Sequence, residues 1–225
     1  MAKITKGTLR EQVNAYLNSK LKLISNEFVL NAVRFPIKDH LQRSEEYHSM
    51  TSEDGGLRGM FGFYKGTEEA YVDAIIDRIV QEMTLVITKK AVSKTSIILG
   101  FDLVVLDYET TSIFNMPEAE IDDEERGYSL PWLEWLMKKG NERFITGFHV
   151  EFSPLGPVDS GISRSGSALM FKKGSWGVPS IYSGTETNNW VTRALSSDNK
   201  SKPKPDLVVA MQYGITQAIE RVLNA

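Results

Sequence analysis

The chain of 225 residues contains no cysteine and only three histidines. Without thiols there can be no disulfide scaffold, thiolate metal site or cysteine nucleophile. No two of the histidines have the close spacing of a zinc-binding helix, which argues against a histidine-rich metal centre. The sequence therefore predicts no metal and no other cofactor.

Long apolar runs are also lacking. The longest, Ile97–Leu106, contains Asp102 and is far shorter than the ~20 residues that a membrane-spanning helix needs. The first residues, MAKITKGTLREQ, lack the apolar core of a secretory signal. The formal net charge of -3 and the pI near 5.7 do not point to a nucleic-acid-binding protein. We expect no membrane partner and no sequence-specific DNA binding.

Helical periodicity is present in three parts of the chain. Apolar residues at steps of three and four predict a helix over Leu9–Val33, with a capping box at Thr8–Glu11 and an end at Pro36. A second apolar face predicts a helix from a cap at Thr67 to about Lys90, and a third predicts a C-terminal helix. All three helices are expected to be amphipathic.

Strand patterns lie between the second and third of these helices. Phe144–Phe152 alternates most clearly, and Ile97–Leu106 reads as one kinked strand or two short ones. Ser167–Lys172 and Trp176–Ser183 are predicted as further strands joined by a short turn. The pattern predicts a single α+β domain over 1–225, in which a mainly antiparallel sheet packs with N-terminal, central and C-terminal amphipathic helices.

Three segments rich in glycine, proline or acidic residues are predicted to be flexible loops. They lie near 49–66, 116–130 and 153–166. The first has five glycines but no lysine-serine or lysine-threonine pair after them, which favours a loop over a phosphate-binding site. Short helices are expected within 131–140 and 188–196.

The segment GSWGVPSIYSGTETNNWVTRAL combines aromatic and turn-forming residues without a catalytic-looking cluster. Trp176, Pro179 and Trp190 offer large, rigid contact area. Arg193 offers a planar fork that can bind a carboxylate or a carbonyl. We expect these residues to be structural or interface determinants, packed either within one subunit or against a neighbour, and not catalytic groups.

The order SRSGSALMF, GSWGVPSIYSGT, NNWVTRAL and then a C-terminal amphipathic helix resembles the small head–tail connector proteins of tailed bacteriophages, which are the neck, tail-completion or minor tail proteins. The resemblance covers about Gly161–Ala225, and the acidic insert at 116–140 departs from the family pattern. The matching positions are Arg164, Gly166, Gly184, Thr185, Trp190, Arg193, Ala194 and Leu195.

The resemblance implies a non-enzymatic structural protein of the virion, located at the head–tail junction and in the host cytoplasm during assembly. Several copies would form a ring that contacts portal or connector proteins and tail proteins. DNA would pass through this ring without sequence-specific binding. The residues expected to form the interface or structural motif are Arg164, Trp176, Pro179, Gly184, Thr185, Trp190 and Arg193.

Two other functions remain open at this point. Asp102, Asp107 and Glu109 lie near strand ends and could bind the metal of a nuclease, with Lys172 or Lys173 stabilising charge in the transition state. An intracellular adaptor that forms no ring is the third possibility. No serine lies in a G-x-S-x-G nucleophile elbow.

Overall fold

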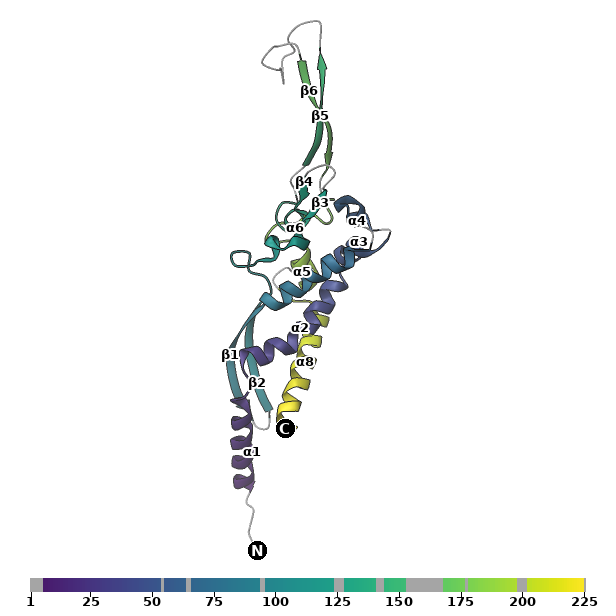
Figure 1. The fold of residues 1–225 in the computed structure, drawn as a ribbon. Coiled ribbons are helices and arrows are strands. Elements are labelled where there is room, and N and C mark those ends of the chain that lie inside the picture. Colours follow the sequence, from purple (N-terminus) through teal and green to yellow (C-terminus); the bar gives the residue numbers. More distant parts are fainter. Residues whose placement is uncertain are drawn as a thin grey trace.

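The structure is a computed structural model, and its architecture is α+β, as the sequence predicts. A central body of helices carries a β-ribbon and a helix at one end and a projecting β-hairpin at the other (Figure 1). The described residues are 6–53, 55–63, 66–93, 96–123, 128–140, 144–152, 168–176, 178–197 and 202–224.

The helices and strands follow one another along the chain without repetition. The helices are α1 (Lys6–Leu21), α2 (Asn26–Gln42), α3 (Glu45–Thr51), α4 (Gly56–Phe61), α5 (Glu68–Glu82), α6 (Trp132–Met137), α7 (Trp190–Leu195) and α8 (Pro205–Asn224). The strands are β1 (Thr84–Ser93), β2 (Ser96–Val104), β3 (Ile121–Asp123), β4 (Tyr128–Leu130), β5 (Phe144–Phe152) and β6 (Ala168–Trp176). Short 3-10 helices occupy Ile113–Asn115 and Pro117–Ala119.

The N-terminal helical region consists of two helices, so the prediction of one helix over Leu9–Val33 is wrong. Ser25 has extended backbone geometry, and its hydroxyl accepts a hydrogen bond from the Phe28 amide at 3.1 Å, which starts α2. The apolar stripe continues across this break because both helices bury one face. α1 begins at Lys6, before Thr8, so Thr8 is not its N-cap.

Pro36 lies inside α2 instead of ending it, contrary to the sequence prediction. A proline has no amide hydrogen, so the carbonyl of Ala32 loses its partner one turn back. α8 covers this carbonyl with Gly214, where an added Cβ would lie 2.5 Å from the Ala32 oxygen. The helix tolerates Pro36 because α8 packs where the helical hydrogen bond is missing.

The central helix is shorter than predicted. α5 ends at Glu82, and β1 begins at Thr84, where the sequence pattern had extended the helix to about Lys90. The apolar positions after Met83 follow strand alternation: Leu85 is buried and Val86 is exposed. The apolar pattern after Met83 was predicted as helical, but these residues form a strand because they pair with β2.

The glycine-rich region near 49–66 holds the end of α3 and all of α4, so it is not the loop that composition predicts. Ser44 caps α3 by accepting a hydrogen bond from the Tyr47 amide at 3.2 Å. α4 ends at Gly62, whose φ of 74° is left-handed and suits glycine. The region near 116–130 contains a 3-10 helix and the β3–β4 hairpin, and 153–166 lies outside the described residues.

The described strands pair as separate antiparallel hairpins: β1 with β2, β3 with β4, and β5 with β6. The β1–β2 ribbon runs from the pair Thr84–Val104 to the pair Ser93–Ser96, with a bulge between Ile87 and Lys89. β2 is one continuous strand, so the sequence's alternative of two short strands is wrong, and the extra residue of the bulge, Thr88, lies on β1. Helices fill most of the space between these hairpins.

β5 has the predicted limits, and β6 contains most of the predicted strand Ser167–Lys172 but continues to Trp176, through the residues predicted as a turn. β6 ends at Trp176, and residues 179–183 form a turn in which the amides of Tyr182 and Ser183 both donate to the Pro179 carbonyl at 2.8 Å. The predicted strand Trp176–Ser183 is therefore wrong.

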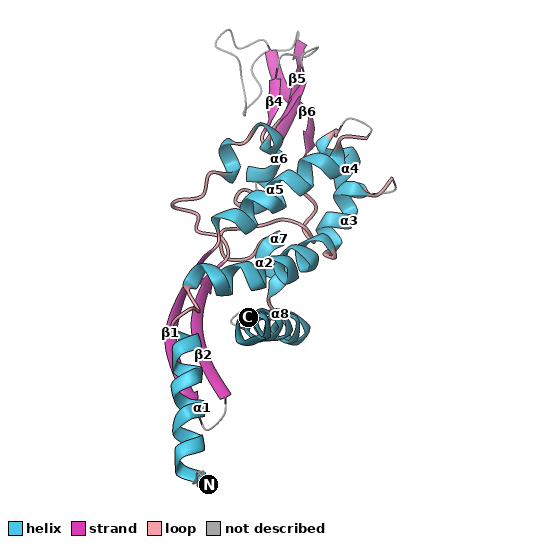
Figure 2. Ribbon diagram, turned by 60° about the horizontal axis from the view of Figure 1, so that its bottom comes forward, coloured by secondary structure: helices cyan, strands magenta, loops and turns pink. Residues whose placement is uncertain are grey.

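The core is organised around α2, which contacts α3, α5, α7, α8 and β1. Figure 2 shows α8 crossing below α2, with the β1–β2 ribbon and α1 to one side. At the other side of the core, Trp132 of α6 packs against the rings of Phe61 and Phe63, with centroids 5.6 and 5.1 Å away. Among the described residues, no helix is long and apolar enough to span a membrane.

Candidate interaction surfaces

The aromatic segment after β6 is bound to the helices of its own chain. We call residues 178–195, which comprise the turn after β6 and helix α7, the clasp. Trp190 is fully buried, and its indole nitrogen donates to the Ser44 hydroxyl at 2.7 Å. That hydroxyl also donates to the Leu41 carbonyl and accepts from the Tyr47 amide. Trp190 therefore packs at the junction between α2 and α3.

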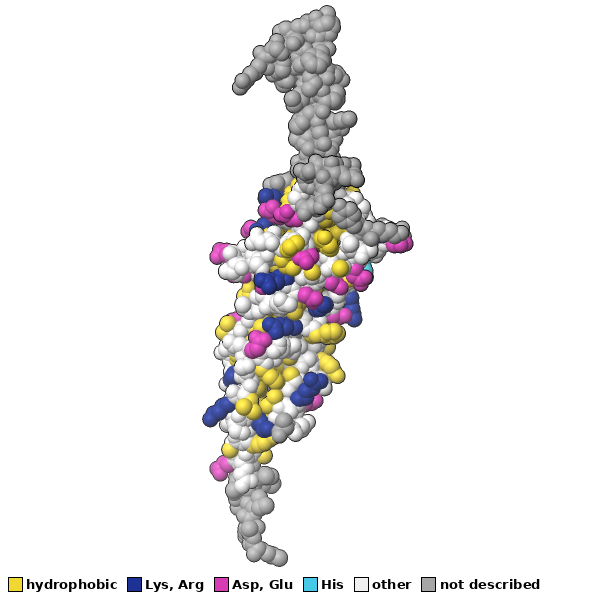
Figure 3. Space-filling model, viewed as in Figure 1, with side chains coloured by type: hydrophobic (Ala, Val, Ile, Leu, Met, Phe, Trp, Pro, Cys, Tyr) yellow, Lys and Arg dark blue, Asp and Glu magenta, His cyan; other side chains and the backbone are white. Residues whose placement is uncertain are grey.

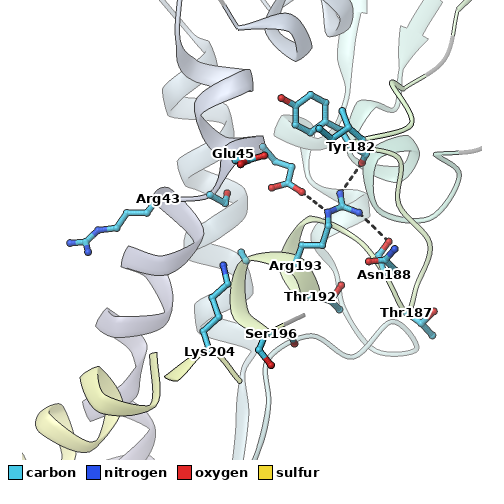
Figure 4. Close-up of a pocket in the computed structure, with 14 residues that line it drawn as sticks. Arg43, Glu45, Tyr182, Thr187, Asn188, Thr192, Arg193, Ser196 and Lys204 are labelled. Carbon is cyan, nitrogen blue, oxygen red and sulfur yellow. Dashed lines mark hydrogen bonds and ion pairs between the residues drawn. The ribbon is translucent and has the colours of Figure 1, made fainter. Parts of the chain in front are cut away.

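Arg193 binds groups from both sides of the clasp. Its Nε lies 2.6 Å from Oε1 of the buried Glu46, so the two form an ion pair. Its terminal nitrogens donate to the carbonyls of Tyr182 at 2.9 Å and Ser183 at 3.1 Å. Figure 4 shows the guanidinium pointing inward between α3 and the turn. The sequence predicted that the Arg193 guanidinium could bind a carboxylate or a carbonyl, and in the structure it binds both kinds of group within its own chain.

Asn189 fastens the start of α7. Its side chain and that of Thr192 form a reciprocal capping box. The side-chain nitrogen of Asn189, Nδ2, also donates to the carbonyls of Thr185 at 2.8 Å and Glu186 at 3.1 Å, and to the hydroxyl of Tyr108. Burial, and then the charge of Glu186, raise the pKa of Tyr108. Tyr108 is therefore a neutral partner, and it ties the clasp to the loop after β2.

Gly184 is required where the clasp meets α6. An added Cβ at Gly184 would lie 2.1 Å from the carbonyl oxygen of Leu136. Gly140, just beyond α6, donates its amide to the Gly184 carbonyl at 3.1 Å, and a Cβ there would lie 2.2 Å from the Gly184 nitrogen. Both glycines serve close backbone approach, which no other residue permits.

The structure brings only part of the predicted motif together. Gly184, Trp190 and Arg193 meet in the clasp, where Pro179 shapes the turn. Thr185 is exposed and its backbone pairs with that of Asn188. Trp176 ends β6, but its side chain and the whole of Arg164 lie outside what the structure describes.

The sequence did not predict the residues that bind Trp190 and Arg193. Ser44 and Glu46 lie almost 150 positions before Trp190 and Arg193, and no local pattern links the two segments. The one available signal was Ser44 followed by acidic residues, which is typical of a helix start. Nothing in that signal identifies Trp190 as a further partner of the Ser44 hydroxyl.

A cavity of about 840 Å³ opens beside the clasp. Lys204, Tyr182 and Arg193 line it, as does Arg43, whose side chain points away from the others (Figure 4). Arg193 is already bonded to Glu46 and to backbone carbonyls. Its hydrogen bonds hold the turn and α3 together, which is a structural use.

The carboxylates proposed for a nuclease do not form a metal-binding group. Asp102 lies on β2, opposite Val86. Asp107 accepts hydrogen bonds from the Glu109 amide and the Thr110 hydroxyl, each at 3.0 Å, and so stabilises a local turn. Within the part of the chain that the structure describes, no three histidine, aspartate or glutamate side chains converge to hold a metal ion.

An apolar groove of about 810 Å³ runs along the surface between α2 and α8. Phe35 is 77% exposed and Tyr213 is 66% exposed, although both are large hydrophobic side chains. We call this surface the helical groove. Its apolar lining includes Phe28, Ala32, Phe35, Pro36, Tyr213 and Val222.

Three apolar side chains are exposed on one face of the β1–β2 ribbon, which also carries the exposed Asp102. Val86 is 58% exposed, Val104 49% and Ile98 40%. We call these residues the ribbon face. The alternate residues Phe101 and Leu103 point to the other side and pack against the core. Figure 3 shows hydrophobic side chains gathered over the lower half of the molecule, where α8 and the ribbon lie.

Comparison with models of protein families, with curated proteins and with solved structures gives no match to this chain.

Proposed function

We propose that the chain is a non-enzymatic structural protein of a tailed-phage particle. In this proposal it forms a ring in the head–tail connector, contacts portal or connector proteins and tail proteins, and lets DNA pass without sequence-specific binding. The observation that carries the proposal is the pair of unlike apolar surfaces, the helical groove and the ribbon face.

These two surfaces point away from each other. Leu207 and Met211 of α8 share a cavity with Phe101 and Leu103 of β2, so these residues face inward. Tyr213 lies two positions after Met211, which is about 200° around a helix, and so faces outward. On β2, the exposed positions alternate with the inward ones, so the ribbon face also points outward.

A closed ring needs this kind of subunit. In a cyclic assembly above two copies, each subunit contacts its neighbours through two different patches, one on each side. Single exposed hydrophobic residues are ordinary on protein surfaces, but clustered ones mark interaction sites. A subunit with unlike apolar patches on opposite sides fits a ring better than a monomeric adaptor.

The clasp supports a structural role for the residues that carry the family resemblance. Close packing within the chain involves Gly184, and internal hydrogen bonds involve Trp190 and Arg193. The net charge of -3 also suits a conduit, because a mildly acidic wall does not trap moving DNA. The proposed sites of the protein are the virion at the head–tail junction and, during assembly, the host cytoplasm.

The test uses particles of the phage that encodes this chain. Antibody-gold labelling is expected to mark the junction between head and tail, and electron microscopy of the purified chain is expected to show rings with a central channel. Absence of the chain from purified particles contradicts the proposal. Cleavage of plasmid DNA with magnesium or manganese that is lost in Asp107→Ala would support the nuclease instead.

A further inference from the structure

We propose that the cavity between the β1–β2 ribbon and the start of α8 binds a small uncharged amphiphile, an aliphatic chain with a hydroxyl head. This binding goes beyond the structural role proposed above and does not depend on it. The class of ligand follows from the volume of the cavity, its apolar wall and the hydroxyl donor of Tyr108 at its polar end.

The cavity has the size of a small-molecule site. Its volume is about 510 Å³, and such sites usually measure roughly 300–1,000 Å³. It is enclosed by β2 and the loop after it, α2, the clasp and the start of α8. The exposed residues Glu186 and Lys202 are among those that line it, so the cavity reaches the surface and a ligand can enter.

Most of the cavity wall is apolar. Phe101, Leu103 and Val105 come from β2 and the loop after it, and Leu207 and Met211 come from α8. All of them except Leu207 are only half-buried. An aliphatic chain in the cavity would remove this apolar surface from water, which is favourable in proportion to the area covered.

The polar end of the cavity is built around Tyr108. Its hydroxyl accepts a hydrogen bond from Nδ2 of the buried Asn189, and Glu186 is close enough for its charge to raise the pKa of Tyr108. Tyr108 is therefore neutral and keeps its own proton. Among the described residues, none accepts a hydrogen bond from this hydroxyl, so the proton is available to a ligand.

A ligand hydroxyl matches both groups at this end. It can accept from Tyr108 and donate to the Glu186 carboxylate, because a hydroxyl is both donor and acceptor. A carboxylate head matches less well, since Glu186 repels it and its charge must leave water. Lys202 also lines the cavity, but it is not among the charges that act on Tyr108.

The test titrates the full chain with straight-chain primary alcohols from butanol to decanol, followed by calorimetry. Saturable binding is expected, and each added methylene should tighten it by about fourfold until the chain fills the cavity. Beyond that length the affinity should stop rising. The alkanoate with the same number of carbons as the tightest alcohol should bind at least about tenfold more weakly.

Tyr108→Phe removes the hydroxyl donor and should weaken alcohol binding by about fivefold. Tyr213→Phe is the matched control, because Tyr213 is exposed and does not line this cavity, and it should leave the affinity unchanged. Val105→Phe fills part of the cavity and should shorten the longest alcohol that still gains affinity. Circular dichroism checks that each variant folds, and the chain-length series with Val105→Phe remains decisive if Tyr108→Phe does not.

Four outcomes overturn the proposal. The first is no saturable binding of any alcohol, and the second is an affinity that rises with chain length in the same way in Val105→Phe. The third is a folded Tyr108→Phe chain with unchanged affinity. The fourth is tighter binding of the alkanoate, which would place the head at Lys202 instead of Tyr108. Since no phage particle enters these titrations, the presence or absence of the chain in particles decides the proposed function separately.

Discussion

The clasp and the helical groove are both rich in aromatic residues, but they differ in where those residues find their contacts. In the clasp, Trp190 is fully buried and Arg193 binds a carboxylate and backbone carbonyls of the same chain. In the groove, Phe35 and Tyr213 are mostly exposed, although they lie on well-formed helices. The clasp is closed within one subunit, and the groove is open.

This difference separates stability from association. Burying an aromatic side chain and satisfying its polar atom stabilises the folded chain, whereas an exposed aromatic side chain adds little until a partner covers it. Substitutions in the clasp should therefore change the free energy of unfolding. Substitutions in the groove should leave it almost unchanged and act on assembly.

The largest effect is expected for Trp190→Ala. Removing this fully buried side chain leaves a cavity between α2, α3 and α7 and a hydroxyl of Ser44 without its donor. The free energy of unfolding should fall by about 4 kcal/mol. Urea unfolding followed by circular dichroism measures it.

Phe35→Ala is the control from the groove. Both substitutions remove an aromatic ring, but Phe35 is exposed, so the loss in unfolding free energy should stay within about 0.5 kcal/mol. Equal losses for Phe35→Ala and Trp190→Ala would contradict the distinction between a closed and an open region.

A smaller effect is expected for Arg193→Met. This change keeps much of the apolar stem but leaves Glu46 buried and without its cation. Breaking one side of a buried ion pair costs about 3 kcal/mol. The double variant Arg193→Met with Glu46→Gln should recover part of the loss, because no unpaired charge remains. No recovery in urea unfolding would mean that Arg193 acts mainly through the carbonyls of the turn.

Gly214→Ala tests the floor of the groove, where α8 packs against α2. The new methyl group would lie 2.5 Å from the Ala32 oxygen, so the helices must separate. Overpacking outweighs the higher helix propensity of alanine, and a net loss of about 2 kcal/mol is expected in thermal or urea unfolding.

Gly59→Ala is its matched control. Gly59 is exposed on α4, and a Cβ there meets nothing within 4 Å. The same change should therefore stabilise the chain by up to about 1 kcal/mol. If both alanines stabilise the protein, the close approach of α8 to α2 is not what holds the groove in shape.

The sequence predicts the parts of the fold in which local pattern and packing agree. The limits of β5 follow from strict alternation, and the short helices α6 and α7 follow from turn residues around apolar clusters. The failures have a tertiary cause. Pro36 remains inside α2 because α8 covers the free carbonyl, and α5 stops at Glu82 because the following residues pair with β2.

The candidate surfaces were harder to predict than the elements. Trp190 and Arg193 were predicted to be structural or interface residues, and they lie in the clasp, but their partners Ser44 and Glu46 carry no sequence signal for this contact. Tyr213 belongs to the C-terminal helix, which was predicted to be amphipathic. Periodicity identifies that face, but it does not tell whether the opposite face is meant for water or for another subunit.

The smallest effect is expected at Glu82, which extends the comparison to a closed polar site outside the clasp. Burial acts to raise the pKa of Glu82, but hydrogen bonds from Ser112 and Thr111 outweigh it, and the pKa is lowered. The shortest of these bonds are 2.5 Å from the Ser112 hydroxyl and 2.6 Å from the Thr111 hydroxyl. Arg78 adds an ion pair at 2.8 Å.

Glu82→Gln should therefore lower the free energy of unfolding by about 1 kcal/mol at neutral pH. A carboxyl whose pKa is lower in the folded state stabilises the protein above its unfolded pKa, and this contribution is lost as the pH falls through the folded value. The difference between the two chains should be full at neutral pH and should disappear in acid, below the ordinary range of a glutamate. A difference that grows on acidification would show that Glu82 is not held as the charged acceptor, and closure by internal hydrogen bonds would then be a property of the clasp alone.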